Sequence, residues 1–118
     1  MFDTLLTATP HRLRLVAAAT AARLEAYPDT PTIAEAGLAG FDGASWFCLL
    51  VPAKTPPEIV ERLSRDLARI VREPAIRAKL IEQGAEPVGG TPEELAAFIR
   101  AEQAKWGAVV REAGIKPD

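Results

Sequence analysis

The sequence has few of the residues from which metal centres and covalent catalysts are usually built. It contains one cysteine and one histidine among 118 residues. A single cysteine excludes an internal disulfide and a cysteine-built metal site, and a single histidine excludes a two-histidine metal motif. We therefore expect no metal ion and no cofactor.

The sequence also lacks an excess of charge of either sign and a long apolar run. Fourteen basic and sixteen acidic residues are intermixed, which argues against a nucleic-acid partner. No apolar run approaches the ~20 residues that span a bilayer, so no membrane insertion is expected. The N-terminus carries Asp3 and no basic region before an apolar run, so the chain as given shows no export signal and would remain cytoplasmic. Length and composition predict one folded domain over residues 1–118.

Two consecutive helices are predicted in the middle of the chain. The first covers about 55–73, with Thr55 as its cap, Pro56 at the first helical position and Glu58 completing a capping box. Its apolar residues recur at helical spacing and are expected to form a buried stripe. These residues are Ile59, Leu63, Leu67 and Ile70. Pro74 ends this helix and starts the second, which is expected to stop at Gly84.

A long C-terminal helix is predicted from Pro92 to Ala113, followed by a stop at Gly114. It begins after "GGT", and backbone amides at a helix start that follows a glycine turn can bind an anion. Thr91 and Glu94, however, can satisfy these amides as a capping box, and Pro92 has no N–H to offer. Acidic residues in the first turn would also repel an anion. A structural cap is therefore favoured over an anion site.

Shorter elements are less clearly defined. Residues 5–12 allow a short helix or a turn, and another short helix is expected between Thr32, its cap, and Gly37. Residues 12–26 fit a helix by their alanines and a strand by their alternation, so both alternatives stay open.

The stretch "ASWFCLLVP", residues 44–52, predicts a strand. It is apolar almost throughout, which is typical of a strand covered on both faces. An interior strand needs a neighbour at each edge, but only 13–20 and 86–88 are available as candidates. The chain therefore resembles part of a larger sheet, or a protomer that completes its sheet with a partner.

Catalytic residue types are present without a convincing arrangement. His11, Asp42 and Ser45 supply the types of a hydrolase triad, but Ser45 lacks the G-x-S-x-G turn that exposes a nucleophile. We expect Cys48 to be a buried, unreactive residue of the strand. Trp46 and Trp106 are expected in the core. An enzyme is therefore disfavoured.

Several segments together resemble a known family. "YPDTPTIAEAGLAGFDGASWFCLLVPAKTPPEIVERL" and "GAEPVGGTPEELAAFIRAEQAKWGAVVREAGIKP", with "MFDTLLTATPH" before them, are similar to the C-terminal part of the Bug, or TctC-type, extracytoplasmic solute receptors. Members are two-lobed periplasmic proteins more than twice this length. They close around small carboxylates and deliver them to the membrane permease of a tripartite tricarboxylate transport system. The resemblance implies an α/β fold, namely an incomplete lobe of the periplasmic-binding-protein type II kind with two or three strands and four or five helices.

The resemblance also suggests ligand-binding residues. "MFD" matches a motif beside the cleft between the lobes, so Phe2 and Asp3 are the ligand-binding candidates. The function implied is that of a fragment or truncated form of a carboxylate receptor, periplasmic by resemblance. The alternative is an orphan interaction module that forms a homodimer through its uncovered apolar faces and binds no ligand.

Overall fold

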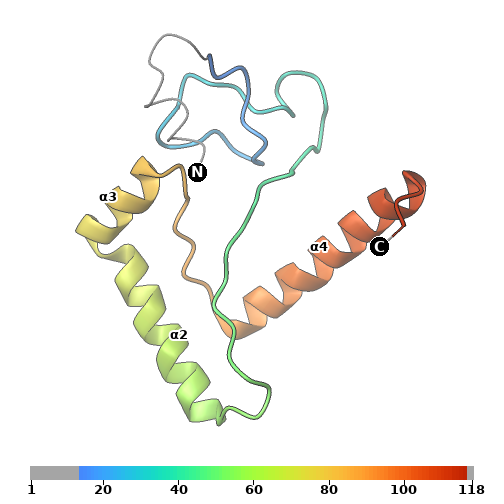
Figure 1. Cartoon of the computed structure of the whole chain (residues 1–118). Helices are drawn as coiled ribbons and strands as arrows, with labels where there is room; N and C mark the ends of the chain where they lie inside the picture. The colour runs from blue at the N-terminus through green and yellow to red at the C-terminus, as the bar shows by residue number, and fades with distance from the viewer. Residues whose placement is uncertain (1–13, 117–118) are drawn as a thin grey trace.

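The computed structural model describes residues 14–116, and within this range the regular secondary structure consists of three helices. These are α2 (Pro57–Arg72), α3 (Pro74–Glu82) and α4 (Pro92–Glu112). Figure 1 shows α2 and α3 as one arm and α4 as a second arm, with extended chain running between them. The loops of residues 14–42 lie at the open end of this arrangement.

Prolines determine where the two middle helices begin. Pro56 is the N-cap of α2, one residue later than predicted, and no side chain caps this helix. The predicted capping box at Thr55 and Glu58 is therefore wrong, because Thr55 lies outside the position from which a side chain reaches the free amides. Pro74 occupies the first position of α3, as predicted. Its fixed φ suits a helix start, and its missing N–H costs nothing there.

Glycines end α3 and α4 in the same way. Gly84 and Gly114 have φ values of 72° and 65°, which side chains with a Cβ rarely adopt. At each end, two backbone amides return to carbonyls of the last turn, as in a Schellman motif. The bonds are Gly84 N to Ile81 O, Ala85 N to Leu80 O, Gly114 N to Arg111 O and Ile115 N to Val110 O. The predicted stops at both glycines are confirmed.

The start of α4 is also confirmed. The Glu94 N–H donates to Thr91 Oγ1 at 3.2 Å, and the Thr91 N–H donates to Glu94 Oε2 at 2.8 Å. Thr32 and Glu35 make the same reciprocal pair, but they cap only one turn, which ends at Gly37 with φ 124°. The short helix predicted there is therefore a single turn.

The predicted strands do not form ladders in the part of the chain that the structure describes. One isolated parallel bridge joins Ala18 to Thr32, while residues 44–52 and 86–88 lie in no ladder. Within 14–116, the predicted two or three strands and four or five helices are thus wrong. A strand exists only when a neighbour accepts and donates its hydrogen bonds, and the described chain supplies none along 44–52. Residues 14–26 contain no helix, and residues 5–12 lie outside the described range.

The described residues bury very little apolar surface. The only buried apolar side chain among them is Ala18, and the stripe on α2 that was expected to be buried is 37–46% exposed. Trp46 and Trp106 are also partly exposed, and Cys48 is exposed, so the prediction that all three are buried is wrong. The accessible surface is 9661 Å², whereas a compact monomer of this mass exposes roughly 6,200 Å². The chain thus leaves open surfaces that a complete domain would cover.

Candidate functional site

The glycine turn before α4 forms a helix cap and leaves no room for an anion. Glu94 folds back over the turn, so that its Oε2 accepts the Thr91 N–H. A Cβ added to Gly90 would lie 2.9 Å from the same oxygen. A carboxylate of the chain therefore already occupies the place where a bound anion would accept hydrogen bonds. The prediction of a structural cap is confirmed.

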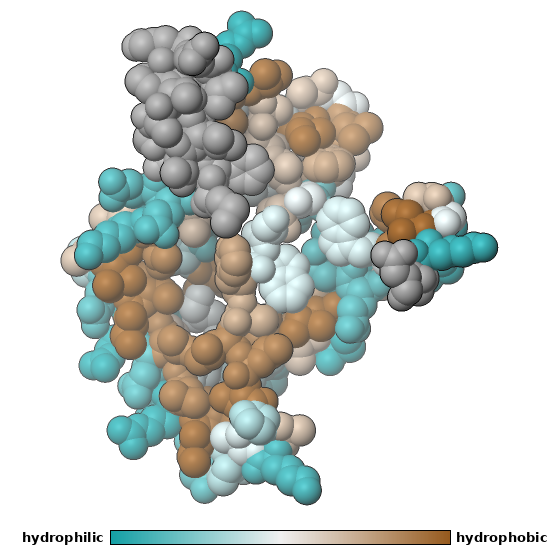
Figure 2. Space-filling view, in the orientation of Figure 1, coloured by the Kyte–Doolittle hydropathy of each residue, from teal (hydrophilic) through white to brown (hydrophobic). Residues whose placement is uncertain are grey.

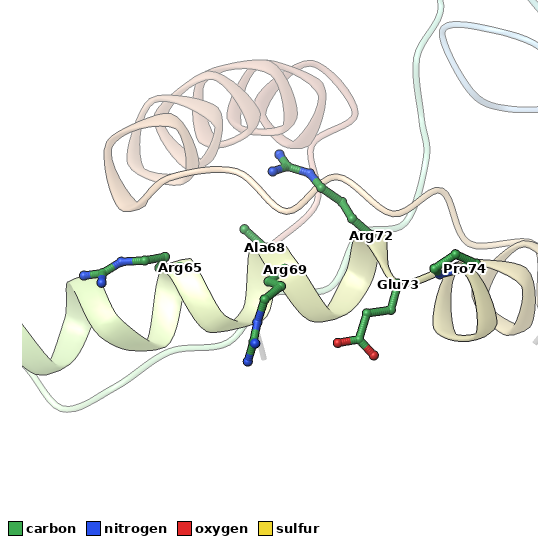
Figure 3. A pocket seen from close by; sticks show the side chains of 6 residues that line it. All are labelled: Arg65, Ala68, Arg69, Arg72, Glu73 and Pro74. Carbon is green, nitrogen blue, oxygen red and sulfur yellow. The ribbon is translucent and has the colours of Figure 1, made fainter.

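A hollow of about 570 Å³ on α2 and the start of α3 is rich in arginine but does not form an anion site. Its lining consists of Arg65, Ala68, Arg69, Arg72, Glu73 and Pro74. Figure 3 shows that the three guanidinium groups point in different directions. Arg72 donates to the Gly89 carbonyl at 3.4 Å, whereas Arg69 lies 3.8 Å from Asp66. Because these cations do not converge, they offer no common site to a carboxylate.

The most closely connected polar group is a cluster around Glu102, which we call the Glu102 cluster; it comprises Trp46, Glu102, Lys105 and Trp106. Glu102 is 8% exposed. Its Oε2 accepts the indole N–H of Trp106 at 2.9 Å and that of Trp46 at 3.3 Å. Its Oε1 pairs with Lys105, and Lys105 Nζ also donates to the Asp42 carbonyl at 3.0 Å. The cluster thereby fastens the start of the extended chain to α4.

These contacts favour the ionised form of Glu102. The hydrogen bond from Lys105, and after it that from Trp106, holds the pKa of Glu102 below its ordinary value. Two indole N–H groups and one ammonium occupy three of the roughly four acceptor positions of this carboxylate. Phe98 adds an edge-on ring contact to Trp46, with centroids 5.3 Å apart. The arrangement positions the start of the extended chain against α4.

Ion pairs connect the N-terminal loops to one another and to α3. Arg77 pairs with Glu25, whose N–H donates to Glu86 Oε1 at 3.0 Å. Arg23 pairs with Glu35 at 3.0 Å. The arginine hydrogen bond is the main cause that lowers the pKa of each of these two glutamates, Glu25 and Glu35. All these side chains are well exposed, so the pairs fix loop geometry more than they add stability.

Part of the extended chain leaves its backbone hydrogen-bonding groups unpaired among the described residues. This part is residues 45–51, which we call the open segment. Within residues 14–116, no backbone hydrogen bond joins this segment to another residue. Its side chains from Trp46 to Val51 are apolar yet exposed, up to 95% at Phe47. Figure 2 shows apolar surface gathered over α2 and around the extended chain. Within residues 14–116, hydrogen bonds hold the near end of the segment, through Trp46 and, just before the segment, through the bond of 2.9 Å from Gly43 N to Ala19 O.

The sequence-predicted site residues lie partly outside and partly inside the described range. Phe2, Asp3 and His11 lie outside the described residues. Asp42 accepts the Ala44 N–H at 3.5 Å, and Ser45 is exposed on the extended chain.

Among residues 14–116, no group of three or more metal-ligating side chains could hold a metal ion. In the same range, no helix has the length and apolarity to cross a membrane. The role of the Glu102 cluster was missed by sequence reasoning, because Glu102 lies 56 positions from Trp46, which donates to it.

Comparison with known proteins gives consistent matches to one family. Residues 4–115 match the family described as "Tripartite tricarboxylate transporter family receptor". A UPF0065 protein of Bordetella bronchiseptica is 35% identical over 106 residues, and Protein BugT of Bordetella pertussis is 36% identical over 104 residues. These alignments cover 90% and 88% of this chain but 31% and 32% of the relatives, so the chain spans about a third of their length.

A solved structure also matches this chain in three dimensions. The structure of R. palustris Rpa4515 with adipate is 42% identical in sequence and superposes with a TM-score of 0.73. The match covers 85% of this chain and 33% of the other chain. The open arrangement of the helices therefore corresponds to one part of a larger folded protein.

Proposed function

Because the chain belongs to the tripartite tricarboxylate transporter family receptors, we propose that it is part of a periplasmic solute receptor for small carboxylates. Such a receptor binds its ligand between two lobes and passes it to a membrane permease, and it carries out no chemistry on it. This chain would supply the helical scaffold and part of the sheet of one lobe. The rest of that receptor would supply the remaining strands and most of the ligand contacts.

The observation that carries the proposal is the likeness to Rpa4515. That protein was solved with adipate, and it shares 42% identity and the arrangement of most of this chain. A linear dicarboxylate is accordingly the ligand class that we expect for the complete receptor. Phe2 and Asp3 are proposed to border the ligand, and they would act only when the other lobe faces them. The chain by itself has no closed ligand cavity among residues 14–116, where the hollow beside Arg72 is open and its cations diverge.

Calorimetry on two proteins tests this proposal. The 118-residue chain alone should give no saturable heat with adipate, citrate, succinate, glutamate or benzoate. A chimera, in which this chain replaces the matching part of Rpa4515, should bind adipate at a single site. A saturable micromolar isotherm with the chain alone would refute the division of the site between the two parts. A folded chimera that binds none of the acids would refute the receptor function of this chain.

A second candidate function is an interaction module that forms a homodimer. The half-exposed apolar stripes on α2 and α4 favour it, because soluble monomers rarely expose connected apolar patches of more than a few hundred Å². Light scattering of the chain alone tests this candidate. A stable dimer that binds no carboxylate in any context would support the interaction module over the receptor.

A further inference from the structure

Four arginines form a row along one side of α2. They are Arg62, Arg65, Arg69 and Arg72, and we call them the arginine row. Because successive members are three or four positions apart, they lie on one face of the helix. The apolar stripe of α2 repeats at the same spacing on the opposite face. The row therefore points away from the apolar stripe.

The charges of the arginine row are poorly neutralised. Between its first and last members the helix carries one carboxylate, Asp66. Arg62 and Arg69 both lie 3.8 Å from this carboxylate, and their side chains are 81% and 72% exposed. Ion pairs this long and this exposed are weak. Arg72 donates to a neutral backbone carbonyl at 3.4 Å. The Arg65 side chain makes no ion pair or hydrogen bond within the described part of the chain.

The stability of α2 accounts for only part of the row. Arg69 and Arg72 lie in the last turn, where cations interact favourably with the helix dipole. Arg62 and Arg65 lie beyond the reach of this effect, which fades within one turn of a helix end. The pair between Arg62 and Asp66 also has the weaker orientation for residues four apart, since its cation is nearer the helix start. These two arginines therefore contribute little to the helix and remain available to a partner.

The spacing of the row selects an extended anion. Figure 3 shows that the guanidinium groups of Arg65, Arg69 and Arg72 point in different directions, so they do not converge on one small carboxylate. From Arg62 to Arg72 the row extends about 15 Å along the axis, at ~1.5 Å per residue. An extended peptide covers this distance with about five residues, at ~3.3 Å each. A partner that contacts the whole row is therefore a short, extended segment with several negative charges.

We propose that the arginine row is a docking surface for an extended segment of another protein, about five residues long and rich in aspartate and glutamate. Arginine suits such a partner, because its planar guanidinium binds a carboxylate through two parallel hydrogen bonds. Resting on the proposed function, we place this segment on the membrane permease that receives the ligand, because the rest of the receptor would cover the apolar stripe of α2 and leave the row outside.

An anionic membrane surface fits the row less well than a short segment does. Exposed carboxylates bracket the row, with Glu61 before it and Glu73 after it. A continuous anionic surface would meet repulsion at both ends, whereas a segment of about five residues fits between them. The chain as a whole has a net charge of −2, which also weakens attraction to such a surface. An amphipathic helix enters a bilayer interface with its apolar face, and that face lies opposite the row.

Fluorescence anisotropy with a labelled acidic peptide tests the docking surface. The probe is a peptide with about five consecutive glutamates, which matches the length of the row. The 118-residue chain should bind the probe saturably, and the affinity should fall as the salt concentration rises. The same peptide with lysine in place of glutamate should not bind, because its charges would be repelled by the row.

A matched pair of double variants tests whether the row is responsible. Arg65→Glu with Arg69→Glu should raise the Kd at least about tenfold, because two attractive contacts become repulsive. The control is Arg100→Glu with Arg111→Glu on α4. It changes the net charge equally, replaces exposed arginines, and likewise combines a mid-helix arginine with one in the last turn. The control should change the Kd less than about twofold, since distant exposed charges are screened.

Circular dichroism checks that each variant keeps its helices. If the reversed charges disturb α2, Arg65→Gln with Arg69→Gln takes their place and should still raise the Kd at least about threefold. Equal losses of affinity in the two glutamate double variants would overturn the docking surface. The absence of saturable binding to the glutamate peptide would do the same. Binding to phosphatidylglycerol vesicles with none to the peptide would assign the row to a membrane and overturn the proposal.

Adipate binding by the chimera with Rpa4515 is a separate measurement. A chimera that binds the glutamate peptide through the row but binds no carboxylate would refute the receptor function and leave the docking surface intact. A chimera that binds adipate but not the peptide would refute the docking surface alone.

Discussion

Two threonines that look alike in the sequence should differ sharply in their contribution to stability. Thr91 and Thr55 each precede a proline and are followed three residues later by a glutamate. In the structure, only Thr91 caps a helix: its Oγ1 accepts the Glu94 N–H at 3.2 Å. The first turn of α2 has no side-chain cap. Thr91→Ala should therefore destabilise the chain, and Thr55→Ala should not.

The magnitude follows from the geometry of the cap. Replacing an N-cap threonine by alanine costs about 0.5–2 kcal/mol. Thr91 is exposed, so water can replace the lost acceptor, and its own N–H still donates to Glu94 Oε2. We therefore expect the lower half of that range, roughly 0.5–1 kcal/mol. Thr55→Ala should stay within about 0.5 kcal/mol of the parent, as surface substitutions away from special contacts usually do.

Urea unfolding followed by far-UV circular dichroism measures this difference. With a denaturant dependence of about 1.5 kcal/mol/M, Thr91→Ala should lower the midpoint by roughly 0.3–0.7 M. Thr91→Ser should restore most of the loss, because serine is as good a cap as threonine. Phosphate or citrate should stabilise the parent and Thr91→Ala equally. Equal losses for the two alanine variants, or an anion effect confined to the parent, would refute the cap assignment.

Three further perturbations test other contacts. In urea unfolding, Gly89→Ala should lower the free energy of unfolding by ~1–3 kcal/mol more than Gly84→Ala does. Both glycines have positive φ, but only at Gly89 would the new Cβ lie 2.7 Å from a side chain of α2. Acidification should release the contact between Glu25 and Arg77. The Arg77 hydrogen bond lowers the pKa of Glu25 below its ordinary 4.5, so its contribution is present above that pH and is lost as pH falls through the lower folded value. Glu25→Gln should therefore reduce the acid sensitivity seen by circular dichroism, and an unchanged acid transition would contradict the pairing. Glu102→Gln should shift indole emission to the red and increase acrylamide quenching, because a neutral amide holds the two indole N–H groups less strongly; an unchanged spectrum would show that the carboxylate does not hold them.

Helix boundaries were largely predictable from the sequence, because their causes are local. Each cause acts within a few residues of the helix end that it determines. These causes are the proline at the first position of α3, the capping box at Thr91, and the left-handed glycines that end α3 and α4. Two local predictions failed, the cap at Thr55 and the short helix after Thr32, which is a single turn. With prolines at both 56 and 57, α2 begins one residue later and leaves the Thr55 side chain outside the cap position.

The family was also within reach of the sequence alone, because the motifs that carry the resemblance extend over most of the chain. The ligand candidates Phe2 and Asp3 stay predictions, since they lie outside the described residues. The Glu102 cluster was beyond sequence reasoning. Nothing in a glutamate on the face of a helix indicates which two indole rings, 56 and 4 residues away, will donate to it.

What the sequence by itself determined is therefore where the three helices of residues 14–116 lie, where each of them stops, and which residues are apolar. It did not determine whether those apolar residues are buried. The stripe on α2 and the residues from Phe47 to Val51 were expected inside, and they are exposed. Apolar patterning records which surfaces favour burial, but burial and strand pairing need a second surface at the right distance and register. Only the tertiary structure shows that, within residues 14–116, this second surface is missing.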